Sequence, residues 1–275
     1  RTPYTLQEET ARMVDGPDIH VIEAPMGMGK TEAALWASYH LLAQGRADGI
    51  FFALPTQATS NRMFLRFADF VRRICPEAAS VQLIHGTSWL QREMKGLVCP
   101  AGEGEKPDPC WFNTSRRSLF APFGVGTVDQ AILAVLAVRY FALRRFALAG
   151  KVVILDEVHT YDMYTGTLIR HLCRELEQLG CTVIILSATL TEKARCELLS
   201  LPFEEERRDA AYPRISVRAC GETLVECCPP SLPEKRVRIA HPDRETALTE
   251  ALDLACRGAQ ILWVCNTVAR AQEDF

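Results

Sequence analysis

Short apolar runs alternate along the chain with longer segments in which apolar residues recur at helical spacing. Most of these runs are apolar at consecutive positions, which is typical of parallel strands that are buried on both faces. Their alternation with helical segments predicts βαβ units stacked on a parallel sheet. Strands are expected at Ile19–Glu23, Gly49–Leu54, Ser80–Ile84, Phe123–Val125, Lys151–Leu155, Thr182–Leu186 and Ala259–Cys265.

The segments between these runs have the length and composition of helices, and two stretches interrupt the rhythm. Residues 95–117 carry Gly, Pro and charge without periodicity, which predicts an inserted surface loop. Residues 201–240 are expected to be a linker, because much of this stretch is rich in Pro, Glu and Arg. The sequence therefore predicts a first α/β domain over residues 1–200 and the beginning of a second over 241–275. Helices are expected at Glu32–Gln44, Thr59–Arg73, Asp129–Leu148, Tyr164–Leu179 and Arg244–Arg257.

Composition narrows the class of protein. With 48% hydrophobic and 24% charged residues, the chain has the composition of a globular protein and not of a disordered or fibrous one. Its net charge of −3 does not indicate a polyanion partner, so any nucleic-acid site has to be local. The longest apolar run, Ala131–Val138, is too short for a membrane helix. We expect no membrane association.

The cysteines and the first residues indicate a cytoplasmic protein. Eleven cysteines without any C-x-x-C pair are typical of reduced thiols and not of a disulfide framework or a paired metal site. The chain opens at Arg1 with neither an initiator Met nor a secretory signal pattern. We expect a piece of a longer cytoplasmic protein.

A glycine-rich loop follows the first predicted strand and opens the first predicted helix. Two glycines allow successive backbone N–H groups to point at one centre, and the helix N-terminus adds a positive dipole end. The Lys and Thr that follow offer a point charge for phosphates and a hydroxyl for Mg²⁺, as in a P-loop. A plain strand-to-helix turn is the competing interpretation. The loop consists of Ala24, Pro25, Met26, Gly27, Met28, Gly29, Lys30 and Thr31.

Two carboxylates, Asp156 and Glu157, follow the strand Lys151–Leu155 directly. Ligands of open α/β sheets bind at this carboxyl edge. Asp156 would hold Mg²⁺, mostly through water, and Glu157 would orient and deprotonate the attacking water. Alone, the pair could be a solvated loop or a helix cap. Together with the glycine-rich loop it predicts a phosphoryl-transfer site, because each motif supplies what the other lacks.

The next strand ends in Ser187-Ala188-Thr189, a position beside the carboxylate strand that suits a polar relay. Capping of the following helix by Thr189 or Thr191 is the simpler alternative. Near the start of the chain, Gln7 lies in a short amphipathic segment and could equally be a surface glutamine.

Taken together, Ala24–Thr31, Asp156–His159 and Ser187–Thr189 resemble the motor motifs of superfamily-2 DExH helicases, in that order. Alanine is frequent at the first loop position of that superfamily. The segments Leu119–Gln130 and Leu148–Asp162 narrow the resemblance to the helicase portion of the CRISPR-associated helicase–nuclease of type I interference systems. The likeness extends over essentially the whole chain and implies a RecA-like parallel sheet flanked by helices, the P-loop NTPase fold.

The resemblance implies ATP and Mg²⁺ as cofactors and assigns roles to individual residues. Gln7 would read the adenine, Lys30 and Thr31 would bind phosphate and Mg²⁺, and Asp156 and Glu157 would be the metal carboxylate and the catalytic base. The residues implied to couple nucleotide and strand are His159, Ser187 and Thr189.

Two further segments would grip a single-stranded backbone according to the same resemblance: Pro55-Thr56-Gln57 and Gly126-Thr127. Hydroxyls and backbone N–H groups at strand ends hold phosphates without reading sequence. Taken singly, both segments fit an ordinary turn or a helix cap. The implied partners are single-stranded DNA and the crRNA-guided surveillance complex, and we expect a monomer in the prokaryotic cytoplasm.

Three functions compete. The leading one is an ATP-driven motor that moves along single-stranded DNA in type I CRISPR defence. The alternatives are another P-loop ATPase, such as a protein remodeller, and a non-enzymatic docking fragment. A motor of this kind needs an arginine from a facing domain, and its loss costs about 10³–10⁵ in rate. We expect residues 1–275 alone to be nearly inactive.

Overall fold

The computed structural model describes residues 5–76, 81–84, 117–158, 163–203, 212–219, 223–230 and 239–274. The chain divides into two units, Arg1–Leu232 and Pro233–Phe275. Among the described helices, none is long and apolar enough to cross a membrane.

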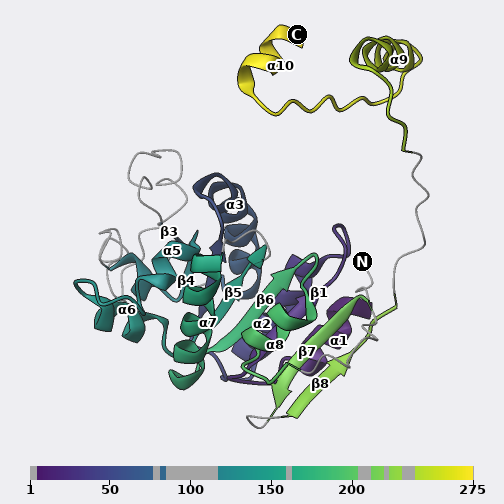
Figure 1. The fold of residues 1–275 in the computed structure, drawn as a ribbon. Helices are drawn as coiled ribbons and strands as arrows, with labels where there is room; N and C mark the ends of the chain where they lie inside the picture. The colour runs from purple at the N-terminus through teal and green to yellow at the C-terminus, as the bar shows by residue number, and fades with distance from the viewer. Residues whose placement is uncertain are drawn as a thin grey trace. The chain divides into compact units, whose positions relative to one another are not determined.

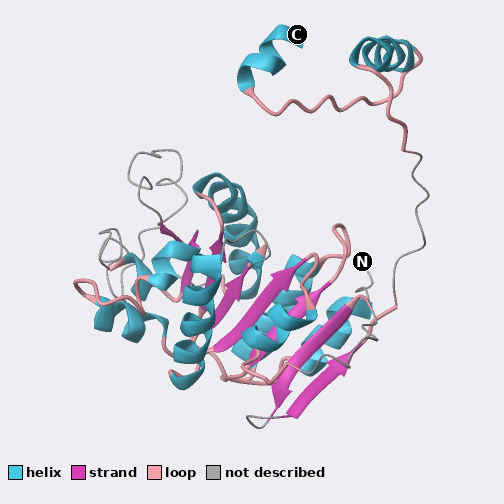
Figure 2. Ribbon diagram, in the orientation of Figure 1, coloured by secondary structure: helices cyan, strands magenta, loops and turns pink. Residues whose placement is uncertain are grey.

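The first unit is built on an eight-stranded sheet in the order β3-β4-β2-β5-β6-β1-β7-β8 (Figure 2). Neighbouring strands from β3 to β1 are parallel, whereas β7 and β8 are antiparallel to their neighbours at the β1 edge. This confirms the predicted α/β fold with a largely parallel sheet. The strands are β1 Ile19–Glu23, β2 Ile50–Leu54, β3 Val81–Ile84, β4 Phe123–Thr127, β5 Val152–Leu155, β6 Thr182–Ser187, β7 Arg214–Ala219 and β8 Thr223–Cys227.

Helices cover both faces of this sheet (Figure 1). In the first unit they are α1 Thr5–Met13, α2 Lys30–Ala43, α3 Gln57–Ile74, the 3₁₀ turn η3 Ser118–Phe120, α5 Val128–Ile132, α6 Phe141–Leu148, α7 Met163–Gln178 and α8 Glu192–Leu198. The second unit contains α9 Arg244–Cys256 and α10 Val268–Asp274.

The core lies in two layers, because alternate residues of each strand face opposite sides. Phe52 and Ile154 pack in the layer under α1, α2 and α3, whereas Phe51 and Val153 pack in the layer that contains residues of α5, α6, α7 and α8. Every residue of β1, β2, β4, β5 and β6 is buried. This burial on both faces explains the unbroken apolar runs.

Two elements differ from the sequence-based expectation. The predicted helix Asp129–Leu148 is two helices, α5 and α6, and Tyr140 before α6 has a left-handed φ of 70°. The predicted strand Ala259–Cys265 does not form. Residues 239–274 contain no other strand to pair with it, and Leu262 and Val264 in this run are 87% and 76% exposed. A strand needs a partner for its backbone hydrogen bonds.

Strands β7 and β8 were not expected, because they lie within the segment 201–240 predicted as a linker. Strand β7 pairs with β1, and β8 pairs with β7. Ile215 and Val217 of β7 are buried, so this short alternating run contributes to the core. The sheet of the first unit therefore extends into the predicted linker.

Candidate functional site

All the predicted site segments that follow parallel strands lie at one edge of the sheet. Because neighbouring strands from β4 to β1 are parallel, their carboxyl ends meet at the same edge. In sheet order, this edge carries Gly126-Thr127 in β4, Pro55-Thr56-Gln57 after β2, Asp156-Glu157 after β5, Ser187–Thr189 at the end of β6 and Ala24–Thr31 after β1.

The loop Ala24–Thr31 turns at its two glycines. Gly27 and Gly29 have φ of 85° and 80°, a left-handed conformation that other residues rarely adopt. A Cβ on Gly27 would meet no atom within 4 Å, so the backbone conformation and not crowding explains this glycine. Helix α2 begins at Lys30 with Gly29 as its N-cap, which provides no side-chain hydrogen bond. The first turn of α2 therefore has no side-chain cap and can face an anion.

The ammonium group of Lys30 folds back onto this loop. Its Nζ donates to the Ala24 carbonyl at 2.6 Å and to the Pro25 carbonyl at 3.3 Å. Burial lowers the pKa of Lys30, and the carboxylates of Asp156 and Glu157 oppose this shift. The loop and the acidic strand end thus interact electrostatically, as a phosphate and metal site requires.

The acidic residues lie at a sharp turn. The Asp156 N–H donates to the Ala53 carbonyl at 3.0 Å, next to the ladder between β5 and β2. The Glu157 N–H donates to Oδ1 of Asp156, also at 3.0 Å. Glu157 has a φ of 53°, and a left-handed conformation at a residue other than Gly is typical of functional sites. His159 lies outside the described residues.

The turn after β6 is tied to the loop after β1. The Ala24 N–H donates to the Ser187 carbonyl at 3.3 Å, and the Ser187 hydroxyl donates to the Thr189 carbonyl at 3.2 Å. Ser187 is buried and Thr189 is exposed. The N-cap of α8 is Thr191, whose hydroxyl accepts from the Ala194 N–H at 3.2 Å. The side chain of Thr189 is therefore not needed as the cap.

Thr56 and Gly126 both have local structural roles. Thr56 caps α3 in a capping box, and its hydroxyl accepts from the Thr59 N–H at 3.2 Å. A Cβ on Gly126 would lie 2.4 Å from the Ile84 carbonyl oxygen, so packing against β3 requires glycine there. Thr127 is buried and makes no cap hydrogen bond to α5. The grip on a nucleic-acid backbone stays a prediction for these segments.

Gln7 lies on α1, which packs against α2. Because α2 begins at the glycine-rich loop, the structure brings Gln7 near the helix that opens the phosphate site. Its side chain is partly buried. The adenine contact stays a prediction.

Glu23, the last residue of β1, is a residue of this region that the sequence analysis missed. It is 2% exposed. Its Oε2 accepts from Nη1 of Arg195 at 2.9 Å and from Nε of Arg214 at 3.1 Å, and its Oε1 accepts from the Leu190 N–H at 3.1 Å. Burial raises the pKa of Glu23 to about 7 against the opposing effect of Arg195. An ionisable residue at the end of the apolar run Ile19–Glu23 is the signal that could have found it.

Comparison with known proteins supports the sequence resemblance. The profile of the DEAD/DEAH box helicase family matches residues 4–197. The CRISPR-associated endonuclease/helicase Cas3 of Thermus thermophilus is 38% identical over 99% of this chain, which covers 31% of that protein. The chain therefore spans about a third of the length of this relative.

Solved structures give the same result. A crystal structure of T. fusca Cas3 with AMPPNP has a TM-score of 0.79 at 31% identity, covering 99% of this chain and 34% of that one. A chain of a CRISPR RNA-guided surveillance complex in a pre-nicking state has a TM-score of 0.65 at 29% identity, covering 98% and 31%. With the family profile spanning most of the sequence, these matches confirm the predicted resemblance: the chain belongs to the DEAD/DEAH box helicase family and is homologous to the helicase portion of Cas3.

Proposed function

We propose that this chain is the ATP-binding region of a helicase that moves along single-stranded DNA in type I CRISPR defence. The observation that carries the proposal is the electrostatic interaction of Lys30 with Asp156 and Glu157 at the carboxyl edge of the sheet. It joins a phosphate-binding loop to an acidic pair from another strand. That combination is the arrangement that phosphoryl transfer uses.

The loop fits a nucleotide triphosphate. Its left-handed glycines and the α2 N-terminus would face the β- and γ-phosphates, and Lys30 would exchange the carbonyls of Ala24 and Pro25 for phosphate oxygens. Glu157 would orient and deprotonate the attacking water. Gln7 would read the adenine, and His159, Ser187 and Thr189 would couple the nucleotide to the strand.

Mg²⁺ would be held by the Thr31 hydroxyl and the Asp156 carboxylate, partly through water. No group of three or more His, Cys, Asp or Glu side chains gathers as a metal site within the described part of the chain. A sparse protein shell suits Mg²⁺, which usually keeps several waters and substrate phosphates as ligands. When bound, the ion neutralises charge on the phosphates.

DNA would cross the same edge of the sheet beyond the acidic pair. Pro55-Thr56-Gln57 and Gly126-Thr127 belong to the neighbouring strands β2 and β4, and Thr56 and Gln57 are exposed. We assign the unit Arg1–Leu232 to the first motor domain and Pro233–Phe275 to the beginning of a second. The homology to Cas3 supports a crRNA-guided surveillance complex as the partner. In this proposal the protein acts as a monomer in the prokaryotic cytoplasm.

The test is the ATPase rate of the full-length protein with and without single-stranded DNA. We expect DNA to stimulate hydrolysis and Lys30→Ala to abolish it. Lys193→Ala, which removes an exposed lysine from α8, is the matched control and should behave as wild type. ATPase that is indifferent to DNA but rises with an unfolded polypeptide would instead identify a protein remodeller.

A further inference from the structure

A group of charged residues surrounds the buried side chains of Glu23 and Arg195, next to the proposed nucleotide site. We call it the Glu23 cluster, and it consists of Glu23 on β1, Glu192 and Arg195 on α8, Arg214 on β7 and Glu226 on β8. Arg195 is 0% exposed. A fully buried arginine is rare unless carboxylates compensate its charge.

Arg195 is the centre of this cluster. Its Nη1 donates to Glu23, its Nη2 lies against Glu192, and its Nε lies 3.8 Å from Oε1 of Glu226. Arg214 makes a parallel set of contacts: its Nε donates to Glu23, its Nη2 lies 3.5 Å from Glu192 and its Nη1 lies 3.8 Å from Glu226. The planar fork of arginine allows one side chain to contact several carboxylates in fixed directions, which a lysine cannot do.

Glu23 is connected to two segments of the proposed nucleotide site. It directly precedes Ala24, the first residue of the glycine-rich loop. Its Oε1 also accepts from the Leu190 N–H, the residue after the Ser187–Thr189 turn. The Ala24 N–H in turn donates to the Ser187 carbonyl. One carboxylate thus holds the base of the loop and the end of the turn in a fixed relation.

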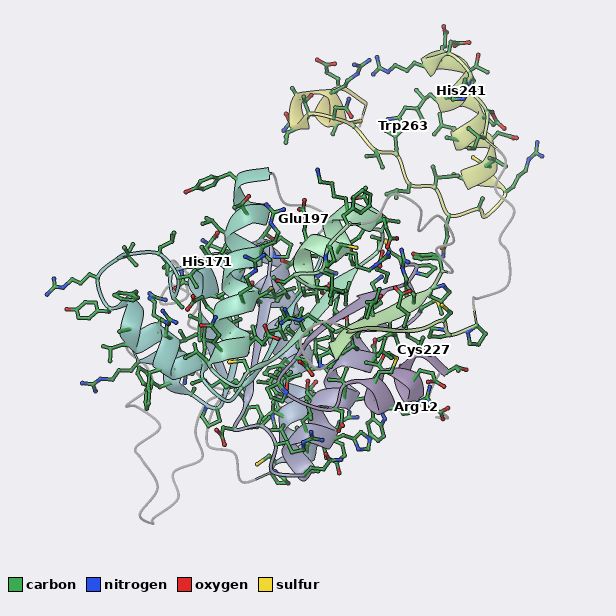
Figure 3. All side chains as sticks on the ribbon, turned by 60° about the horizontal axis from the view of Figure 1, so that its bottom comes forward. Arg12, His171, Glu197, Cys227, His241 and Trp263 are labelled. Carbon is green, nitrogen blue, oxygen red and sulfur yellow. The ribbon has the colours of Figure 1, made fainter. Side chains whose placement is uncertain are left out.

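The same cluster joins the site to the β7–β8 hairpin. Arg214 belongs to β7 and Glu226 to β8, and the Ser216 hydroxyl donates to Oε1 of Glu226 at 3.0 Å. Directly after Glu226, at the end of β8, the Cys227 thiol donates to Oε2 of Glu9 on α1 at 3.4 Å, where Arg12 also lies (Figure 3). The chain leaves this hairpin toward the second unit. Along the chain, the hairpin is the last described pair of strands before that unit.

Stability alone is a poor explanation for such a cluster. Buried ion pairs often add little net stability, because desolvation of the charges offsets their attraction. Glu192 and Glu226 are also partly exposed, so water screens their attraction to the two guanidinium groups. Hydrogen bonds from Arg195 and Arg214 to Glu23 can fix geometry, which an apolar packing would not do.

We propose that Arg195 is a positioning residue of the nucleotide site, which acts through Glu23 on the loop Ala24–Thr31 and on the Ser187–Thr189 turn, and which couples both to the β7–β8 hairpin. The proposal rests on the proposed function, since it concerns the rate of ATP hydrolysis. In this proposal Arg195 acts through Glu23 and not by direct contact with nucleotide or metal. Its effect is on the alignment of the groups that make such contact.

The experiment compares Arg195→Met and Arg195→Lys with wild type in the full-length protein. The rate constant kcat and the KM for ATP are measured with saturating single-stranded DNA, together with the affinity for a fluorescent nucleotide and the melting temperature. We expect Arg195→Met to lower kcat by roughly ten- to a hundredfold, because small misplacement of reacting groups has effects of that size. KM should change by less than about threefold, since the loop still binds phosphate. Arg195→Lys should recover only part of kcat.

Arg218→Met is the matched control. Arg218 lies on the same strand, β7, and pairs with Glu177 on α7 instead of with Glu23. We expect Arg218→Met to leave kcat within about twofold of wild type. Wild-type kcat and DNA stimulation in Arg195→Met would overturn the proposal, as would an equal loss of kcat in Arg218→Met.

A second variant covers the case in which Arg195→Met fails to fold. Glu226→Gln removes only the half-exposed carboxylate of the hairpin, so the fold should survive. It should lower kcat, by less than Arg195→Met does, while leaving nucleotide affinity unchanged, and a wild-type kcat would again overturn the proposal. Absence of DNA-stimulated ATPase in the wild type would refute the proposed function, a result distinct from either of these.

Discussion

Lys30 and Asp156 interact electrostatically although they follow strands that are not neighbours. Strand β6 lies between β1 and β5 in the sheet, yet the Asp156 carboxylate opposes the lowering of the Lys30 pKa by burial. The segments that carry Lys30 and Asp156 therefore lie close together at the carboxyl end of β6. Ser187 and Thr189 lie at that end, which brings all three motifs of the proposed site into one region.

Lys30→Ala should strongly weaken the binding of nucleotide phosphates. The change removes the point charge in the loop, and loss of hydrogen bonds from a charged group costs about 1.5–3 kcal/mol, or about ten- to more than a hundredfold in affinity. Fluorescent nucleotide titration measures the effect, and circular dichroism establishes that the fold is intact. Unchanged affinity in a folded variant would show that the phosphates bind elsewhere.

Glu157→Gln should separate binding from hydrolysis. Glutamine keeps the size and one hydrogen-bonding oxygen but cannot accept a proton from water. We expect ATP to bind the full-length variant normally while hydrolysis falls by roughly 10²–10⁴. Single-turnover hydrolysis and nucleotide titration measure the two steps, and turnover at the wild-type rate would assign the base to another residue.

Gly27→Ala should strain the glycine-rich loop and weaken nucleotide binding, whereas Gly166→Ala should stabilise the fold. A Cβ meets no atom within 4 Å at either position, but Gly27 has a φ of 85°, whereas Gly166 lies in helix α7. Alanine at 27 should cost about 1–2 kcal/mol in the loop conformation and weaken nucleotide binding. Alanine at 166 should raise the free energy of unfolding by up to about 1 kcal/mol through helix propensity. Urea unfolding and nucleotide titration of both variants provide the comparison.

The Glu23 carboxyl should make stability fall as the pH rises. Its pKa is raised from 4.5 to about 7 in the folded state, so the folded protein binds the proton more tightly than the unfolded chain. The contribution of this group to the free energy of unfolding is therefore largest at acidic pH and is lost as pH rises through about 7. Glu23→Gln should flatten this part of the pH profile of the melting temperature.

Glu197→Gln is the matched control for that measurement. Glu197 pairs with Arg170 on α7 and is more exposed than Glu23. Its removal should leave the change of melting temperature with pH, between about pH 5 and 8, as in wild type. The same slope in Glu23→Gln as in wild type would place the titrating group elsewhere.

The sequence predicts the central sheet well because its strands are buried on both faces. Unbroken apolar runs such as Ile50–Leu54 and Val183–Leu186 can be recognised without knowledge of their neighbours. Strand β7 could not be recognised in this way. Its sequence Arg214–Ala219 alternates apolar and polar residues over a short stretch among Pro, Glu and Arg, and only pairing with β1 makes it a strand.

The candidate region likewise contains residues that the sequence identifies and a contact that it could not reveal. The loop Ala24–Thr31 and the pair Asp156-Glu157 are local patterns with their own chemistry, so the sequence identifies them. The contact between Glu23 and Arg195 joins residues separated by 172 positions and leaves no periodic pattern. The expected strand Ala259–Cys265 illustrates the converse case, since this apolar run remains exposed and residues 239–274 contain no strand that could pair with it.

Glu157 also shows that folding and chemistry make opposite demands on one position. Its left-handed backbone, with φ of 53°, favours glycine, and a carboxylate-bearing residue there costs about 1–2 kcal/mol of conformational energy. Glycine at 157 would relieve that cost and remove the proposed base in the same substitution. Under the proposed function, a search for thermostable variants guided by backbone conformation alone would therefore select an inactive protein at this position, and stabilisation is better sought away from the end of β5.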